Sequence, residues 1–116
     1  MGDDRSEILQ GTLDLMVLKT LDAMGPMHGY GIALRIEQVA ENAMRVNQGT
    51  LYLCLVRLLQ QKWLSATWGT SDNNRRARFY ALTAAGRRHL QAETANWARV
   101  SGVMDRLLQL PKVVAP

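Results

Sequence analysis

Residues 47–83 read NQGTLYLCLVRLLQQKWLSATWGTSDNNRRARFYALT. Asn47 is a favourable N-cap residue, and the apolar side chains after it recur every three or four positions, which predicts a helix. Residues 64–68 and 78–82 are strand-like runs, and residues 69–74 between them are dense in turn formers. The stretch therefore predicts a helix followed by a β-hairpin with a long loop.

Helices are predicted on both sides of this stretch. Apolar spacing predicts one helix over residues 6–24, which Gly25-Pro26 ends, and a second over residues 28–41. The apolar members of the second are Tyr30, Ile32, Leu34, Ile36 and Val39. Thr83 caps a last helix that runs to about Leu110, just before Pro111. Three helices, a two-stranded hairpin and a long helix make a mainly α fold, in the order of a winged helix-turn-helix with a dimerisation helix.

The composition fits one small domain. The chain has 116 residues, of which 47% are hydrophobic. We expect residues 1–82 to form the winged helix-turn-helix and residues 83–116 the C-terminal dimerisation helix and tail, as one compact unit.

No apolar run approaches the roughly 18 residues of a membrane span. Two acids, Asp3 and Asp4, stand where a secretory signal would be positive, so we expect a cytoplasmic protein without a membrane partner. The lone Cys54 excludes an internal disulfide, and with only two His residues beside it we expect no metal and no cofactor.

Basic residues are concentrated in the middle of the chain. Residues 42–92 hold eight Lys or Arg and one acid, Asp72, for a net charge of +7. Residues 1–41 carry three bases and seven acids, for a net charge of −4, so the total of +4 hides a strongly polarised molecule. A basic field of this kind attracts a polyanion, the first requirement of a nucleic-acid binder.

Four short motifs resemble, in order and spacing, the PadR family of bacterial transcriptional regulators. They are Met27-His28-Gly29-Tyr30, Gly49-Thr50-Leu51-Tyr52, Asn74-Arg75-Arg76-Ala77-Arg78-Phe79-Tyr80 and Leu82-Thr83-Ala84-Ala85-Gly86-Arg87. The resemblance covers about residues 8–110. Asn47-Gln48, Trp63 and Glu93-Thr94-Ala95-Asn96-Trp97 are most similar to its acidobacterial-type branch, and the single terminal helix is similar to its short C-terminal type. PadR-like chains usually have Pro directly after the tyrosine of the second motif, where this chain has Leu53, so their operator preference does not carry over.

Candidate DNA contacts lie in the third helix and in the hairpin. Side chains near the N-terminus of a recognition helix reach base edges, and arginines at a hairpin tip enter a minor groove or hold phosphates. The candidates are Asn47, Gln48, Gly49, Thr50, Tyr52, Arg57, Asn74, Arg75, Arg76 and Arg78. The alternatives are an ordinary capped helix start and a solvated loop whose charge protects an edge strand. Only some of the arginines can face DNA, because Arg76 and Arg78 alternate with Ala77 and Phe79 along the strand.

The last helix carries an apolar stripe that its own small domain cannot cover. Its members are Leu90, Trp97, Val100, Met104 and Leu107, which we expect to form the seam of a homodimer. Trp97-Ala98-Arg99-Val100 also matches a Trp-x-Arg-Val sequence whose Trp, in a PadR-like multidrug-binding branch, stacks on flat ligands between subunits. Trp97 is therefore either a seam residue alone or also a ligand contact.

We expect His28 to cap the second helix rather than sense pH, and Cys54 to be an inert buried thiol rather than a redox sensor.

The function that follows is a DNA-binding transcriptional regulator. The resemblance implies a dimeric repressor of the PadR type on a palindromic operator in double-stranded DNA, and leaves open whether a small aromatic effector releases it. The alternative is a winged-helix protein-interaction module without DNA binding, which predicts an acidic or apolar third-helix face; the basic balance argues against it. No catalytic triad, pair of carboxylates or phosphate loop is recognisable, so we expect no enzyme.

Overall fold

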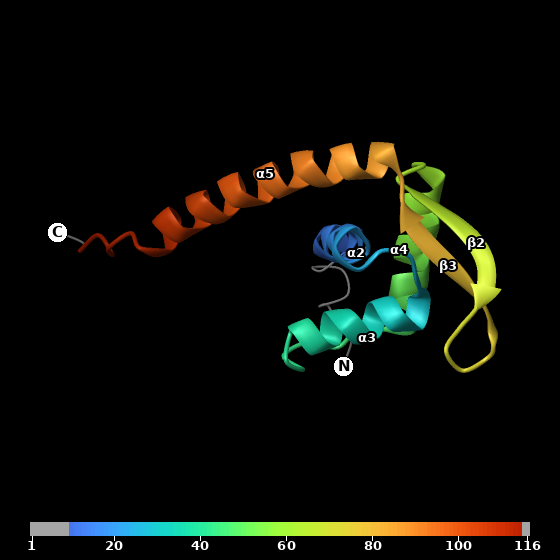
Figure 1. Cartoon of the computed structure of the whole chain (residues 1–116). Coiled ribbons are helices and arrows are strands. Elements are labelled where there is room, and N and C mark those ends of the chain that lie inside the picture. Colours follow the sequence, from blue (N-terminus) through green and yellow to red (C-terminus); the bar gives the residue numbers. More distant parts are fainter. Residues whose placement is uncertain (1–9, 115–116) are drawn as a thin grey trace.

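The computed structural model describes residues 10–114. Along the chain it has α2 (Gln10–Met24), β1 (Met27–His28), α3 (Gly29–Val39), α4 (Gln48–Gln60), β2 (Leu64–Thr70), β3 (Arg76–Leu82) and α5 (Ala84–Leu108), as Figure 1 shows. The predicted mainly α winged helix-turn-helix with a long terminal helix is confirmed. Residues 6–9, with which the first predicted helix begins, lie outside the described residues. The last helix ends at Leu108, two residues earlier than predicted.

The three predicted helix caps are present. His28 Nδ1 accepts a hydrogen bond from the Gly31 amide at 3.0 Å and so begins α3, which confirms its expected capping role. The Asn47 and Thr83 side-chain oxygens do the same for α4 and α5, each at 2.9 Å. Each cap satisfies a backbone N–H that has no partner within its helix.

Residues in the left-handed conformation follow α2 and α4. Gly25, at φ 82°, follows α2 and confirms the predicted stop. Lys62, at φ 64°, follows α4, and the Trp63 amide donates back to the Leu58 carbonyl at 3.1 Å, which is the Schellman arrangement. This turn directs the chain from α4 straight into β2.

The sheet has three strands where the sequence predicted two. β3 is central, with β2 on one side and β1 on the other, and all pairs are antiparallel. β1 is only two residues long, and it pairs Met27 with Tyr80 and His28 with Phe79. β2 and β3 are each seven residues long, so the loop of the hairpin is shorter than predicted.

The core lies among α2, α3 and α4 and is closed by one residue from each of β2, β3 and α5. Its buried side chains are Leu13, Val17, Leu18, Leu21, Ile32, Ala33, Ile36, Val46, Leu51, Cys54, Leu55, Leu58, Leu64, Tyr80 and Leu90. The predicted apolar stripe of α4 is confirmed, since four of its members are in this core. The prediction for α3 was partly wrong: α3 buries Ile32, Ala33 and Ile36, while Tyr30, Leu34 and Val39 are exposed.

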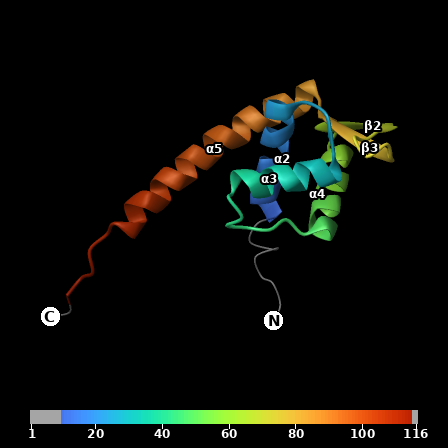
Figure 2. The same ribbon diagram turned by 60° about the horizontal axis from the view of Figure 1, so that its bottom comes forward.

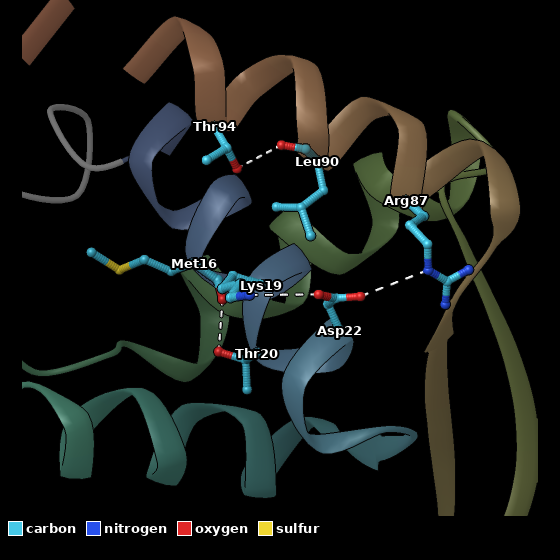
Figure 3. Close-up of polar contacts among 7 residues, drawn as sticks. All are labelled: Met16, Lys19, Thr20, Asp22, Arg87, Leu90 and Thr94. Carbon is cyan, nitrogen blue, oxygen red and sulfur yellow. Dashed lines mark hydrogen bonds and ion pairs between the residues drawn. The ribbon is translucent and has the colours of Figure 1, made fainter. Parts of the chain in front are cut away.

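Among the described residues, α5 packs against the other elements through its N-terminal half. Leu90 points from α5 toward α2, and Asp22 of α2 lies between Lys19, at 3.6 Å, and Arg87 of α5, at 3.7 Å (Figure 3). Beyond this contact the helix projects away from the other elements (Figures 1 and 2). The radius of gyration is 17.1 Å, against about 13 Å for a compact chain of this length. A substantial part of the terminal helix therefore has no packing partner among the residues that the structure describes.

Candidate nucleic-acid interface

An open cleft of about 980 Å³ lies between the first turns of α3, the first turns of α4 and the hairpin. The side chains around it include Tyr30 from α3, Gln48 and Tyr52 from α4, and Arg75, Arg76 and Arg78 from the hairpin. These residues come from three segments spread over about half of the chain. The cleft therefore brings together the N-terminus of the predicted recognition helix and the predicted wing.

The first turn of α4 presents two side chains one turn apart. Gln48 and Tyr52 are exposed, and the residue between them on the inner side, Leu51, is buried in the core. Asn47 and Thr50 are engaged with each other, because the Asn47 side-chain oxygen accepts from both the amide and the hydroxyl of Thr50. The first turn contains no acidic residue, so nothing on α4 offsets the partial positive charge of its N-terminus.

The hairpin presents two arginines on one face. In the register of β2 and β3, Arg76 lies opposite Thr70 and Arg78 opposite Trp68, on the face that also carries the buried Tyr80. Ala77 and Phe79 are on the other face. The predicted alternation is confirmed.

The tip of the hairpin is held by its own hydrogen bonds. Ser71 donates its amide to the Arg75 carbonyl at 2.8 Å, and its hydroxyl donates to the same carbonyl at 3.1 Å. Asn74, at φ 60°, donates its amide to the Ser71 carbonyl at 2.9 Å. Within residues 10–114, Arg75, Arg76 and Arg78 form no ion pair. Arg75 of this loop and Arg76 and Arg78 of β3 thus have no acidic partner among the described residues.

The family comparison decides the identity of this arrangement. The family model described as the transcriptional regulator PadR-like family matches residues 17–92, which include α3, α4 and the whole hairpin. The chain belongs to the PadR-like family of transcriptional regulators. The resemblance found in the four motifs is confirmed, and the three-stranded sheet and long helix fit the same fold.

Known proteins similar to this PadR-like chain extend over nearly its full length. A transcriptional regulator from Clostridium thermocellum superposes with a TM-score of 0.80 at 20% identity, over 89% of this chain and 99% of that chain. A PadR family transcriptional regulator from Eggerthella lenta superposes with a TM-score of 0.73 at 27% identity, over 90% of this chain and 88% of that one. An uncharacterized protein of Lysinibacillus sphaericus, protein X, is 26% identical over 105 residues, which is 90% of this chain and 95% of that protein.

The structure places Arg57 of this PadR-like protein away from the cleft. Arg57 lies in the last turn of α4, and its Nη2 forms an ion pair with Asp14 of α2 at 2.5 Å. The Cys54 thiol donates to the same carboxylate oxygen at 2.9 Å. Because Arg57 is held against α2, we leave this predicted DNA contact out of the proposed interface.

Cys54 is buried, as expected. Burial and the hydrogen bond to Asp14 raise the pKa of the Cys54 thiol well above its ordinary value. The thiol is therefore protonated near neutral pH, and a protonated buried thiol is a poor nucleophile.

Leu53, the residue before Cys54, is 60% exposed, and α4 is continuous through this position. Leu in place of the usual Pro therefore leaves the fold intact.

The predicted seam residues of α5 fall into two groups. Leu90 is 5% exposed in the core of its own chain, so it is not available to a partner, and its assignment to the seam was wrong. Trp97, Val100, Met104 and Leu107 are each about half exposed, at 48–55%. These four form the stripe that no part of residues 10–114 covers.

Two residues at the cleft and the hairpin are absent from the set of predicted DNA contacts. Tyr30, which the sequence left open as a core residue or a phosphate contact, lines the cleft and is 65% exposed. Trp68 is 61% exposed on the face of the hairpin that carries the arginines. The cross-strand register reveals Trp68, and its signal in the sequence was an aromatic residue seven positions before the first wing arginine. Within the described residues there is no cluster of three or more potential metal ligands, and none of the helices there has the length and apolarity to cross a membrane.

Proposed function

We propose that this chain is a dimeric repressor that binds a palindromic operator in double-stranded DNA. The observation that supports it most is the cleft, in which the exposed start of α4 lies around one open space with three hairpin arginines that pair with no acid of residues 10–114. A helix with its side chains is about 10–12 Å wide, and the major groove is about 12 Å wide, so α4 fits it.

The two parts of the cleft have different roles in this proposal. Gln48 and Tyr52 extend from α4 toward base edges, where a glutamine side chain can form two hydrogen bonds with adenine. Asn47, Gly49 and Thr50 keep the helix start in place and let its backbone amides approach phosphate. Asn74 and the wing arginines hold the phosphates of the adjacent groove, which fixes the register without reading sequence.

The stripe of Trp97, Val100, Met104 and Leu107 supports the dimer. Its side chains are about half exposed on a helix that leaves the body of the chain, and an apolar surface of this kind favours association. A second copy related by a two-fold axis covers both stripes at once. The same axis places two copies of α4 on one duplex about 34 Å apart, or a multiple of that distance, and so requires a palindromic site.

Trp97 is also the proposed contact for a small aromatic effector. Its indole is 52% exposed in the single chain and lies at the start of the stripe, where a flat ligand could stack on it beside the seam. Repression itself requires only operator occupancy, for which a DNA-binding face and a dimer contact suffice.

Sedimentation of the full chain at micromolar concentration tests the dimer. Met104→Glu should shift a dimer to monomer, and a monomeric wild type would contradict the proposed dimer.

Selection of bound sequences from random duplex DNA tests the proposal directly. A palindromic consensus is the expected result, and binding should weaken steeply as salt is added. The double variant Arg75→Ala/Arg76→Ala removes four arginines per dimer, so the slope of log K against log salt should fall by about 3 to 4. Arg106→Ala, on the distal part of α5, is the control for net charge, and its slope should stay close to that of the wild type. No enrichment of any sequence would favour the protein-interaction module instead.

A further inference from the structure

One contact on the hairpin has no role in the interface described so far. The guanidinium carbon of Arg76 lies 4.6 Å from the centroid of the Trp68 ring. Trp68 is on β2 and Arg76 on β3, and the register of the strands puts both side chains on one face. The ring is 61% exposed, so burial in the core does not account for a tryptophan at this place.

A cation over an aromatic face keeps its hydrogen-bonding capacity. The attraction is between the charge and the electron-rich face of the ring, and it engages none of the five N–H donors of the guanidinium. The donors lie in the plane of the group and stay available for a phosphate. No acid of the described residues forms an ion pair with Arg76. Trp68 therefore restrains the Arg76 side chain and leaves its N–H donors free to bind DNA.

The backbone under Trp68 is itself fixed. Gly69, the next residue, lies under the ring of Phe79 on the opposite face, so close that a Cβ on Gly69 would be 3.0 Å from two ring carbons. Phe79 is held in turn against His28 of β1, with ring centroids 5.5 Å apart. Trp68 therefore extends from β2 at a place where the opposite face of the sheet is packed against Phe79. The hairpin loop next to it is closed by its own hydrogen bonds.

We propose that Trp68 is a positioning residue of the wing, which holds the Arg76 guanidinium beside the cleft so that it meets a phosphate with little loss of side-chain freedom. The inference rests on the proposed DNA-binding function. An arginine left free in solution loses rotamer entropy when it is immobilised on a ligand. Trp68 reduces this loss because it restricts Arg76 before the DNA arrives.

A double-mutant cycle on the selected operator tests the inference, with Trp68→Ala, Arg76→Ala and the double variant. An exposed cation–π contact corresponds to about a two- to fivefold effect per wing, so Trp68→Ala should weaken the dimer about five- to thirtyfold. Its salt slope should be close to that of the wild type, because Arg76 keeps its charge. Arg76→Ala should lower the slope by about 2, for two lost phosphate contacts. In the Arg76→Ala background, replacing Trp68 should have no further effect.

Trp68→Phe and thermal unfolding separate positioning from a structural role. Phe offers an aromatic face to the cation, so Trp68→Phe should recover most of the lost affinity. The melting temperatures of all variants should stay near that of the wild type, because both side chains are exposed. An equal loss from Trp68→Ala with and without Arg76 would overturn the inference and make Trp68 a direct contact.

The failure of the inference can be told apart from the failure of the proposed function. If Arg76→Ala weakens binding and Trp68→Ala does not, the inference alone is overturned. If Arg76→Ala leaves affinity and salt slope unchanged, Arg76 does not contact the DNA, and if the wild type selects no duplex, the proposed function is overturned as well. Either of these results also overturns the role of Trp68.

Discussion

Replacing Gly86 by Ala should destabilise the protein, although the same change in an ordinary helix stabilises it. Gly86 is in the first turn of α5, where its backbone lies against the carbonyl of Trp63, the residue before β2. A Cβ at this position would lie 2.0 Å from the Trp63 carbonyl oxygen and 2.9 Å from a methyl carbon of Leu82. The carbonyl belongs to the backbone and already accepts from the Thr83 amide at 3.0 Å, so it cannot turn aside.

The size of the effect follows from opposing terms. Ala has a better helix propensity than Gly, by about 0.8–1 kcal/mol. Relief of the overlap requires the start of α5 to move by about an ångström, and overpacking of this kind costs about 1–3 kcal/mol, or somewhat more. The Thr83–Trp63 hydrogen bond is lost as well, at about 1 kcal/mol. We expect a net loss of about 1–3 kcal/mol, which lowers the melting temperature by roughly 4–12 °C for a chain of this length.

Gly102→Ala is the matched control on the same helix. A Cβ at Gly102 would meet only the end of the Arg106 side chain, at 3.9 Å. This glycine also lies on the side of α5 opposite to the Trp97 stripe, so the change leaves the proposed dimer seam untouched. Gly102→Ala should raise the melting temperature by a few degrees. The two variants are compared by calorimetry at one protein concentration, and a rise for Gly86→Ala equal to that for Gly102→Ala would refute the reasoning.

Three further predictions concern α4. Cys54 should resist alkylation by iodoacetamide at pH 8 in the native protein and react readily in urea, because its pKa is raised by burial; rapid native labelling would contradict the buried, protonated thiol. Asp14→Ala should lower the free energy of unfolding by about 1–3 kcal/mol in a urea titration, since Arg57 and the thiol lose their acceptor, while Asp14→Asn should lose less; equal losses would mean that the hydrogen bonds contribute little. Gln48→Ala and Tyr52→Ala should change which operator variants are preferred, by about 1–3 kcal/mol per base read, whereas a uniform loss over all variants would make them positioning residues.

The features that the sequence predicted well depend on neighbours close along the chain. The caps of α3, α4 and α5 each use a side chain that bonds to an amide three residues later, so His28, Asn47 and Thr83 could be recognised locally. The same holds for the turn at Gly25, whose positive φ suits glycine. Two of the three wing arginines could be placed on one face from alternation alone, and the register bears this out.

The features that the sequence did not predict depend on contacts between residues that are far apart in the chain. β1 is two residues long, and only its partner residues in β3, more than fifty positions away, make it a strand. Arg57 was expected at DNA because its charge is visible, while the acid that holds it is 43 positions earlier. In α3, apolar residues occur on both sides of the helix, and Ala33 is buried while Tyr30 is exposed, so periodicity could not choose the inner face. Leu90 was assigned to a partner because its contact with α2 is not visible from α5 alone.

The short strand β1 also limits how the protein can adapt to its site. His28 belongs to the sheet and caps α3 at the same time, so it links the helix-turn-helix to the hairpin at a second place, besides the turn that leads from α4 into β2. The hairpin cannot swing while α3 and α4 stay in place. For a protein that holds DNA with both parts, the number of base pairs between the contacts of α4 and those of the hairpin is therefore constant. In the proposed dimer, operators that differ in the length of a half-site should therefore be rejected, and differences in spacing should be tolerated only in the segment between the half-sites.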